Sequence, residues 1–203
     1  MAMERMRQRF SQDPSYFFDE TKMNLTASES NPSGRAGHIP GHPPGSWYVN
    51  RAECSKARVH GKTVAGIHGS KDNGAYSICI SGGYEDDYDR GDFIVYTGTG
   101  GQFDTSFGGG RAQREDQSFL HPDNAALAKN VETGRPARVI RGPVPKGHEA
   151  SVYAPSSGYR YDGLYKVTKA YLAKGRSGFQ ICRYELERLP NQVPLKEIIR
   201  NSP

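Results

Sequence analysis

The chain has 203 residues, of which 24 are glycine and 13 are proline, with a net charge of +5 and a mean hydropathy of −0.74. This length suits one domain with a tail, and the many turn-forming residues argue against a long helical bundle. Apolar runs such as Phe93–Tyr96 do not exceed about four residues, which excludes a membrane-spanning helix, and the polar segment Met1–Phe10 lacks the apolar core of a secretory signal.

The N-terminal region, residues 1–37, predicts a partly ordered tail or appendage, because polar stretches surround one short helical segment, Glu4–Phe10. Prolines and glycines over residues 40–45 then indicate a loop that leads into a folded domain. We expect that domain to cover residues 38–190 and a C-terminal tail to cover residues 191–203.

Short strands separated by glycine-rich turns are predicted for most of the domain. One helix is expected from Asn124 to Val131, with Asp123 as its N-cap and Gly134 at its end, and a second short helix at Leu195–Arg200. The strand segments are rich in Tyr, Val, Ile and Phe. They are Ser46–Arg51, Thr63–Ile67, Tyr76–Ile80, Asp92–Thr97, Ala137–Arg141, Gly163–Leu172 and Phe179–Leu186. The pattern predicts a mainly β (α+β) fold, a barrel or curved sheet with a few flanking helices.

Charge is distributed unevenly along the chain. Residues 1–40 hold five basic and five acidic residues, so the positive excess lies in residues 41–203, although Glu85–Asp92 is strongly acidic. A basic surface beside an acidic cluster is typical of a protein that binds a polyanion at a specific pocket, and a solvated surface with a mild basic bias fits equally well. The basic residues of the C-terminal half include Arg135, Arg138, Arg141, Lys146, Arg160, Lys166, Lys169, Lys174, Arg176 and Arg183.

Three stretches of sequence form a collinear set of motifs. Val64–Gly69 reads Val-Ala-Gly-Ile-His-Gly, residues 81–101 contain Ser-Gly-Gly-Tyr-Glu-Asp-Asp and Tyr-Thr-Gly-Thr-Gly-Gly, and Tyr161–Val167 reads Tyr-Asp-Gly-Leu-Tyr-Lys-Val. In this order and spacing they resemble the SET- and RING-associated (SRA) domain, also called the YDG domain, from Gly37 to Leu189. The adjoining residues 72–77 and 177–179 fit the same family.

The resemblance implies a twisted, crescent-like β-barrel of the SRA/PUA-like type with helices packed beside it. Members of this family bind duplex DNA that contains 5-methylcytosine, with CpG as the expected context, and flip the modified base out of the helix. The chain would then be a non-enzymatic epigenetic reader in the nucleus, with modified double-stranded DNA as its partner, no membrane partner and no cofactor. A reader of 5-hydroxymethylcytosine is an alternative, as is the recognition domain of a larger modification-dependent enzyme.

A flipped base needs two flat faces to replace its lost stacking. Tyr84 and Tyr96 fall where the family places its two stacking aromatics. Stacking recovers roughly 1–3 kcal/mol per base, which offsets an unstacking cost of a few kcal/mol. Without the motif, ordinary strand-end core residues would be the better interpretation of both tyrosines.

Asp87 matches the family aspartate that distinguishes cytosine from thymine. A carboxylate accepts a hydrogen bond from the N4 amino group of cytosine and repels the corresponding carbonyl of thymine. A solvated acidic turn is the alternative for this acidic cluster, as is a cation-binding loop. The 12-residue calcium-loop pattern is missing, however, and we expect no metal site.

The rest of the pocket is implied by the same motifs. Thr97 would add a hydrogen bond to the base. Thr99 stands where relatives often carry serine, so its methyl group would narrow the niche for a 5-methyl group and its hydroxyl could contact a hydroxymethyl group. Backbone groups would read the remaining base edge, and glycine permits their close approach. These are the backbone groups of Ser81, Gly82 and Gly83.

Two loops of the family enter the duplex from opposite grooves. Val64 matches the thumb, whereas the finger loop, residues 102–111, lacks the Asn-Lys-Arg tip of relatives that read hemimethylated CpG. Phe103 or Phe107 could act there as an apolar wedge. This departure puts hemimethylation specificity and strict CpG context in question, but not flipping. Phosphate contacts are expected from Arg111, Arg114, Lys169, Lys174 and Arg176, each of which could equally be solvated.

The sequence also bears on functions other than DNA reading. The chain has no deaminase signature, no Gly-x-Ser-x-Gly elbow and no Pro-Cys nucleophile, and its six histidines show no metal-ligand spacing. Its three cysteines, Cys54, Cys79 and Cys182, are too few for a disulfide framework or a four-cysteine zinc site, which favours a reduced intracellular protein. A protein–protein adaptor remains the third class, and it predicts no salt-dependent DNA binding.

Overall fold

The computed structural model describes residues 34–102, 113–145 and 151–202, all within one compact unit, residues 31–203. The predicted helix Glu4–Phe10 and almost all of the predicted tail lie outside the described residues. None of the described helices is long and apolar enough to cross a membrane.

The described part of the chain is mainly strand, with three helices: α2 (Arg51–Lys56), α3 (Pro122–Thr133) and α4 (Leu195–Arg200). The strands are β1 (Trp47–Tyr48), β2 (Ile67–Ser70), β3 (Gly74–Ile80), β4 (Tyr88–Asp89), β5 (Phe93–Thr97), β6 (Ala137–Arg141), β7 (Tyr159–Lys174) and β8 (Gln180–Arg188). The mainly β fold with a few flanking helices, predicted from composition and turn spacing, is confirmed.

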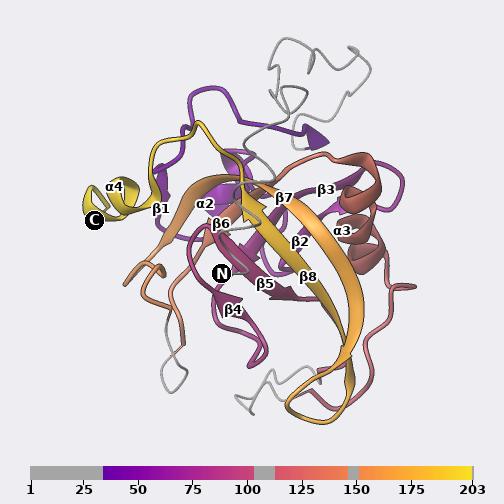
Figure 1. Cartoon of the computed structure of the whole chain (residues 1–203). Coiled ribbons are helices and arrows are strands. Elements are labelled where there is room, and N and C mark those ends of the chain that lie inside the picture. Colours follow the sequence, from indigo (N-terminus) through magenta and orange to yellow (C-terminus); the bar gives the residue numbers. More distant parts are fainter. Residues whose placement is uncertain (1–33, 103–112, 146–150, 203) are drawn as a thin grey trace, which may run out of the picture. The chain divides into compact units, whose positions relative to one another are not determined.

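All eight strands belong to one sheet with the order β2-β3-β6-β7-β8-β5-β4, and β1 pairs with β7. The β3–β6 pair is parallel and the other pairs are antiparallel. The end strands of this path, β2 and β4, are not paired with each other within the described chain, so the sheet is open rather than a closed barrel. Figure 1 shows the long strands β7 and β8 curving along their length, as a crescent requires.

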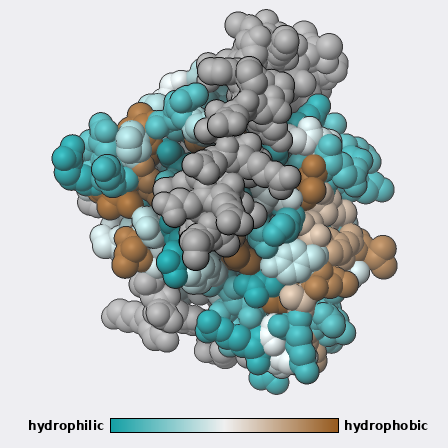
Figure 2. Space-filling model, in the orientation of Figure 1, coloured by the Kyte–Doolittle hydropathy of each residue, from teal (hydrophilic) through white to brown (hydrophobic). Residues whose placement is uncertain are grey.

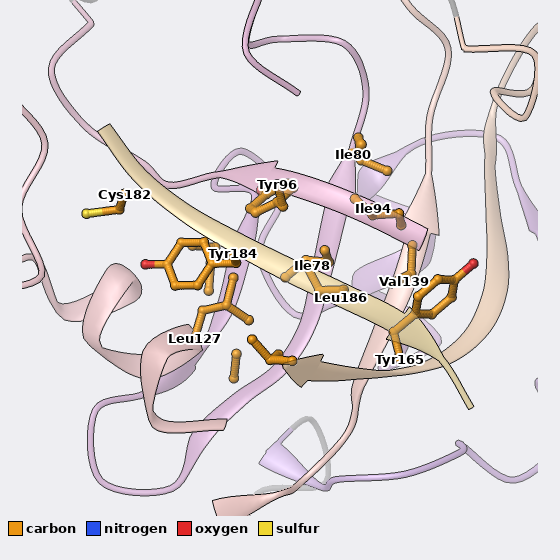
Figure 3. Packing of buried hydrophobic residues seen from close by; sticks show 13 residues of the cluster. Ile78, Ile80, Ile94, Tyr96, Leu127, Val139, Tyr165, Cys182, Tyr184 and Leu186 are labelled. Atoms are coloured by element: carbon orange, nitrogen blue, oxygen red, sulfur yellow. The ribbon is translucent and has the colours of Figure 1, made fainter. Parts of the chain in front are cut away.

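The main core lies between the sheet and α3, which contacts β2, β3 and β7. Its residues include Ile78, Ile94, Leu127 and Leu186, all fully buried, and Figure 3 shows them packed around the middle of the sheet. A second cluster, around Cys54, Val59 and Ile140, packs under α2. On the face seen in Figure 2, hydrophobic residues are visible around α3 and again on the side of α4 and β1, with hydrophilic residues beside both groups.

Helix α3 begins two residues earlier than predicted, at Pro122 rather than Asn124. Its N-cap is His121, whose Nδ1 accepts a hydrogen bond from the Asp123 N–H at 3.2 Å, and Pro122 opens the helix. Asp123 is therefore not the N-cap but an acidic residue in the first turn. Its negative charge there interacts favourably with the positive end of the helix dipole. The predicted end is confirmed, because Gly134 is the left-handed C-cap with a φ of 68°.

The strand predicted at Thr63–Ile67 is wrong except for its last residue. Residues 61–66 form a loop, and β2 begins at Ile67. The β-branched residues Thr63 and Val64 favour a strand locally, but Arg51 draws this segment into a loop by donating hydrogen bonds to the carbonyls of Lys62 and Ala65. Helix α2 and strand β4 were not predicted, because six and two residues leave too short a pattern.

Candidate nucleic-acid interface

The predicted base pocket begins where β3 ends, in the turn Ser81–Gly83. Gly82 has a φ of 64°, and a Cβ there would lie 2.8 Å from a methyl carbon of Val144. Only glycine tolerates both the left-handed backbone and this close approach, so Gly82 of the motif is a steric requirement. The turn therefore presents backbone groups without side chains at the end of a buried strand.

Asp87 is brought to the end of β5 by the turn that follows. Its N–H donates to the carbonyl of Tyr84 at 3.3 Å, and its carboxylate Oδ1 accepts from the backbone N–H of Thr97 at 2.8 Å. Burial raises the pKa of Asp87 to about 7, against the Thr97 hydrogen bond and the positive charge of Arg183, which both lower the pKa. A carboxylate with a pKa raised by burial marks a candidate site rather than a solvated acidic turn.

The two predicted stacking tyrosines converge on Asp87 but differ in exposure. Tyr84 is partly buried, whereas only 3% of Tyr96 is exposed and its ring lies in the main core (Figure 3). The Tyr96 hydroxyl donates to the carbonyl of Cys79 at 3.3 Å. Burial raises the pKa of Tyr96 well above its usual value, and the nearby Asp87 and Tyr84 raise it further, which places the three predicted pocket residues together. A base can stack on Tyr96 only after the side chains around that ring move.

The two predicted pocket threonines are held by different partners. Thr97 is 1% exposed, and its Oγ1 makes no hydrogen bond with any described group. The backbone of Thr99 exchanges hydrogen bonds with Asn124 of α3, since its N–H donates to Oδ1 at 2.8 Å and its carbonyl accepts from Nδ2 at 3.0 Å. The buried hydroxyl at Thr97 is thus a polar group still available to a ligand.

Two amide side chains that the sequence did not single out fix the Thr97–Gly101 segment. Besides Asn124, Gln117 donates from Nε2 to the carbonyl of Gly98 at 2.9 Å and accepts the N–H of Cys182 at 3.0 Å. Both amides are buried, with exposed fractions of 0% and 4%. The sequence gives no signal for them, because a polar residue near a helix start is more often a surface residue.

Val64, the predicted thumb residue, is 90% exposed at the tip of the loop of residues 61–66. Arg51 donates to the Lys62 carbonyl at 2.8 Å and to that of Ala65, and it lies 2.8 Å from Nε2 of the buried His60. Burial lowers the pKa of His60 well below its usual value, so the ring is neutral, and its Nε2 also lies 3.1 Å from the Ala65 carbonyl oxygen. The apolar side chain of Val64 is thus exposed to solvent on a loop that the hydrogen bonds of Arg51 hold in place.

The predicted finger residues Phe103, Phe107 and Arg111 lie outside the described residues. On either side of them, Gln102 and Gln113 pair as an isolated antiparallel bridge.

The remaining predicted phosphate contacts fall into two groups. Arg114, Lys174 and Arg176 are exposed, and none of them has a side-chain ion pair within the described chain. Lys169 instead pairs with Glu185 at 2.9 Å, which raises the pKa of its ammonium group. Lys174 and Arg176 flank the turn of the β7–β8 hairpin, which contacts the loop that carries Asp87.

The basic surface is smaller than the sequence implied. Arg138, Arg141 and Arg160 are at most 1% exposed and contribute nothing to an external basic face. Arg141 donates to both carboxylate oxygens of Asp89, at 2.7 and 2.8 Å, and to Asp162 at 2.7 Å. Arg160 donates to Asp162 at 2.5 and 2.9 Å. We call these four residues, Arg141, Asp89, Asp162 and Arg160, the buried ion network.

The Tyr-Asp-Gly signature is explained by this network. Tyr161 forms a hydrogen bond with His38 Nδ1 at 2.8 Å, and Asp162 lies between the two arginines of the network. Gly163 has a φ of 107°, which only glycine adopts without strain. The signature is therefore structural in this chain and does not line the candidate pocket.

Within the described residues, no group of three or more His, Cys, Asp or Glu side chains could hold a metal ion. Two carboxylates of the acidic segment are already used within the fold, because Asp89 is clamped by Arg141 and Asp86 accepts the backbone N–H of Arg176. The chemistry available here is recognition by a partly buried carboxylate, backbone groups, a buried hydroxyl and two aromatic rings.

The described fold is an open, curved sheet with a carboxylate and two tyrosines near one end, and comparison with known proteins identifies its family. The family model described as the SAD/SRA domain matches residues 35–192. The chain therefore belongs to the SAD/SRA domain family.

Individual relatives agree with this assignment. A UHRF1-like protein of Cryptococcus neoformans var. grubii is 46% identical over 171 residues, which cover 79% of this chain and 48% of that protein. Among solved structures, a modification-dependent TagI restriction endonuclease has a TM-score of 0.69 and 44% identity, covering 77% of this chain and 53% of the other. The chain thus spans about half the length of both relatives.

The SRA domain of SUVH5 matches over nearly its whole length. Bound to methylated CHH DNA it has a TM-score of 0.62 with 30% identity, covering 78% of this chain and 97% of the other. Bound to fully hydroxymethylated CG DNA it has a TM-score of 0.64 with 30% identity, covering 79% and 99%.

Proposed function

We propose that this domain binds duplex DNA containing 5-methylcytosine and flips the modified base into the pocket formed by Tyr84, Asp87, Tyr96, Thr97 and Thr99. The observation that carries the proposal is the position of Asp87: a partly buried carboxylate, fixed by the Thr97 N–H beside two tyrosines. A carboxylate so placed accepts the N4 amino group of cytosine and disfavours thymine. Family membership and the DNA complexes of the SUVH5 SRA domain support the ligand class.

The roles of the other residues follow from this arrangement. The Ser81–Gly83 backbone and the unpaired Thr97 hydroxyl supply further hydrogen bonds to the base edge. Val64 enters the duplex as an exposed apolar thumb, in concert with the finger loop, and Arg114, Lys174 and Arg176 neutralise phosphates. The reader itself catalyses no reaction and acts in the nucleus.

A second candidate ligand is 5-hydroxymethylcytosine. The Thr99 side chain stands at the predicted 5-position niche, and the SUVH5 SRA domain forms a complex with hydroxymethylated DNA. A larger modification-dependent enzyme could also contain this domain, since the chain spans about half of the TagI endonuclease.

The test is fluorescence-polarisation binding to one duplex whose CpG is unmodified, hemimethylated, fully methylated or hydroxymethylated. Excess unmodified DNA at physiological salt serves as competitor, because only the specificity ratio is meaningful for a basic protein. We expect a clear preference for a modified duplex, and Asp87→Ala to abolish that preference while weak, salt-sensitive binding remains. Lys196→Ala, on α4 and exposed, is the control and should keep the preference. Equal binding to all four duplexes by the wild type would refute the proposal.

A further inference from the structure

Arg183 is a partly buried arginine on strand β8. It lies on β8 directly opposite Thr97 of β5, so the two side chains share one face of the sheet. The neighbouring residues Cys182 and Tyr184 point to the opposite face and belong to the main core. Arg183 therefore stands on the face where Thr97 holds the Asp87 carboxylate.

The guanidinium of Arg183 reaches the loop that carries Asp87. Its Nη2 donates to the backbone carbonyl of Asp86 at 2.9 Å, whereas its Nε is buried and has no hydrogen-bond partner among the described residues. A guanidinium that is partly removed from water in this way needs a compensating negative charge nearby. Asp87 lies close enough to contribute such a charge, since the positive charge of Arg183 is one of the causes that lower the pKa of Asp87.

The same loop is fixed from the other side by the β7–β8 turn. The Asp86 carboxylate, 9% exposed, accepts the backbone N–H of Arg176 at 3.1 and 3.4 Å, and the Ser177 hydroxyl donates to Glu85. The peptide preceding Asp87 is thus held at both its side chain and its carbonyl. A carboxylate that reads a base must be fixed to a fraction of an ångström, and such support comes from residues behind it.

We infer that Arg183 is a positioning residue for recognition of the modified base: it fixes the backbone at Asp86 and sets a positive charge beside Asp87, so that the carboxylate is ionised and in place when DNA binds. This inference rests on the proposed function, in which Asp87 reads the base edge. Arg183 itself touches no base.

The charges around Asp87 are consistent with this role. Burial raises the pKa of Asp87 to about 7, the charge of Asp89 raises it further, and Arg183 lowers it. Asp89 is itself paired with Arg141, which offsets its effect. The phenols of Tyr84 and Tyr96 face the same site, and burial raises the pKa of Tyr96 well above its usual value, so that ring is neutral. Loss of the Arg183 charge should therefore leave Asp87 protonated to a higher pH.

The experiment measures the preference for methylated over unmodified duplex as a function of pH in the wild type, Arg183→Gln and Arg183→Lys. We expect the wild-type preference to appear as the pH rises through about 7. In Arg183→Gln this midpoint should move up by about one pH unit, since an opposite charge at this range shifts a carboxyl pKa by about 1–3 units. Arg183→Lys, which keeps the charge, should stay near the wild type.

Arg176→Gln is the matched control, because it removes one positive charge from the adjoining hairpin turn while its backbone N–H still binds Asp86. It should weaken binding to both duplexes by the same factor and leave the midpoint in place. An equal shift of the midpoint in Arg176→Gln would mean that general charge, rather than Arg183, sets the behaviour of Asp87, and would overturn the inference.

A carboxyl-carbon NMR titration without DNA separates this inference from the proposed function. The Asp87 signal, assigned by its loss in Asp87→Asn, should titrate at higher pH in Arg183→Gln than in the wild type. An unchanged titration overturns the inference even if the wild type prefers methylated DNA. If the titration shifts but the wild type shows no preference at any pH, the proposed function fails and the role of Arg183 in recognition fails with it. Should Arg183→Gln not fold, a full upward shift in Arg183→Lys would exclude the charge mechanism.

Discussion

Asp87 and Asp89 are separated by one residue in the same acidic segment, yet they occupy contrasting sites. Asp89 is clamped through both oxygens by Arg141 and receives the Ser151 hydroxyl at 2.9 Å, so its hydrogen-bonding capacity is used within the fold. Asp87 has one backbone hydrogen bond, and burial raises its pKa to about 7. The two residues have the same side chain, so the difference lies in their partners. A carboxylate whose oxygens are all bound within the fold is structural, whereas one with few partners can still bind a ligand.

The energetic consequences of the two arrangements also differ. In the buried ion network, two arginines and two aspartates compensate one another at exposures of 5% or less. Removing one member leaves an uncompensated buried charge. In the pocket, the carboxylate of Asp87 is incompletely paired, which lowers the stability of the folded state. Such a loss of stability is common at sites that bind a ligand.

The largest expected effect comes from breaking the buried ion network. Asp162→Ala removes the carboxylate shared by Arg141 and Arg160, and should lower the free energy of unfolding by about 3–5 kcal/mol. Urea denaturation followed by circular dichroism measures this. The matched control is Asp92→Ala, since Asp92 is 76% exposed and 4.0 Å from Arg188, and should stay within about 0.5 kcal/mol. Equal effects of the two variants would show that the network is not structural.

A smaller change in the free energy of unfolding is expected at Asp87, where a substitution should stabilise the protein rather than destabilise it. Its folded-state pKa, about 7, lies above the ordinary value of 3.8, so the folded protein binds the proton more tightly than the unfolded chain. The contribution of Asp87 to wild-type stability should therefore fall as the pH rises from about 4 to about 7. Asp87→Asn removes this dependence and should be more stable than the wild type by about 1–3 kcal/mol at pH 8. Thermal unfolding at pH 5 and pH 8 measures it, and lower stability of the variant at both values would count against the assigned pKa.

Lys169 and Lys174, two of the lysines of strand β7, extend the comparison of paired and unpaired charges to the surface. Lys174 has no ion pair within the described residues, whereas Lys169 is paired with Glu185. Lys174→Gln should reduce the slope of log binding constant against log salt by about 1, with the same loss for every duplex. Lys169→Gln should change the slope less, because its charge is already partly neutralised. Salt titrations on methylated and unmodified DNA measure both, and a larger change for Lys169→Gln would reverse the assignment.

The smallest effect on folding is expected at the thumb. Val64 is 90% exposed, so Val64→Ala should change stability by less than about 0.5 kcal/mol. Base flipping should nevertheless weaken, while the preference for the modified base stays the same. The fluorescence of 2-aminopurine placed beside the modified cytosine measures flipping. Val152→Ala, at a residue 84% exposed, is the control. Flipping that is unchanged in Val64→Ala would exclude the thumb role.

The sequence alone predicted the elements whose signals are local. Residue type and turn spacing located β3, β5, β6, β7, β8 and the end of α3, because strand-forming runs and a left-handed glycine cap act over a few residues. The motif order also indicated the SRA family, which the family match over residues 35–192 establishes. Composition and motif order thus determined the fold class and the family.

Only the tertiary structure decided which charges are buried and which are paired. Arg138, Arg141 and Arg160 read as surface basic residues in the sequence, but the paired strands β6 and β7 bring them into the interior. Likewise, the motif singled out Asp87, but nothing local shows that Asp89 is paired with Arg141 or marks Arg183 as a neighbour of Asp87, since the segments that meet are far apart in the chain. Burial and ion pairing depend on which distant segments meet, and a single sequence does not encode that locally.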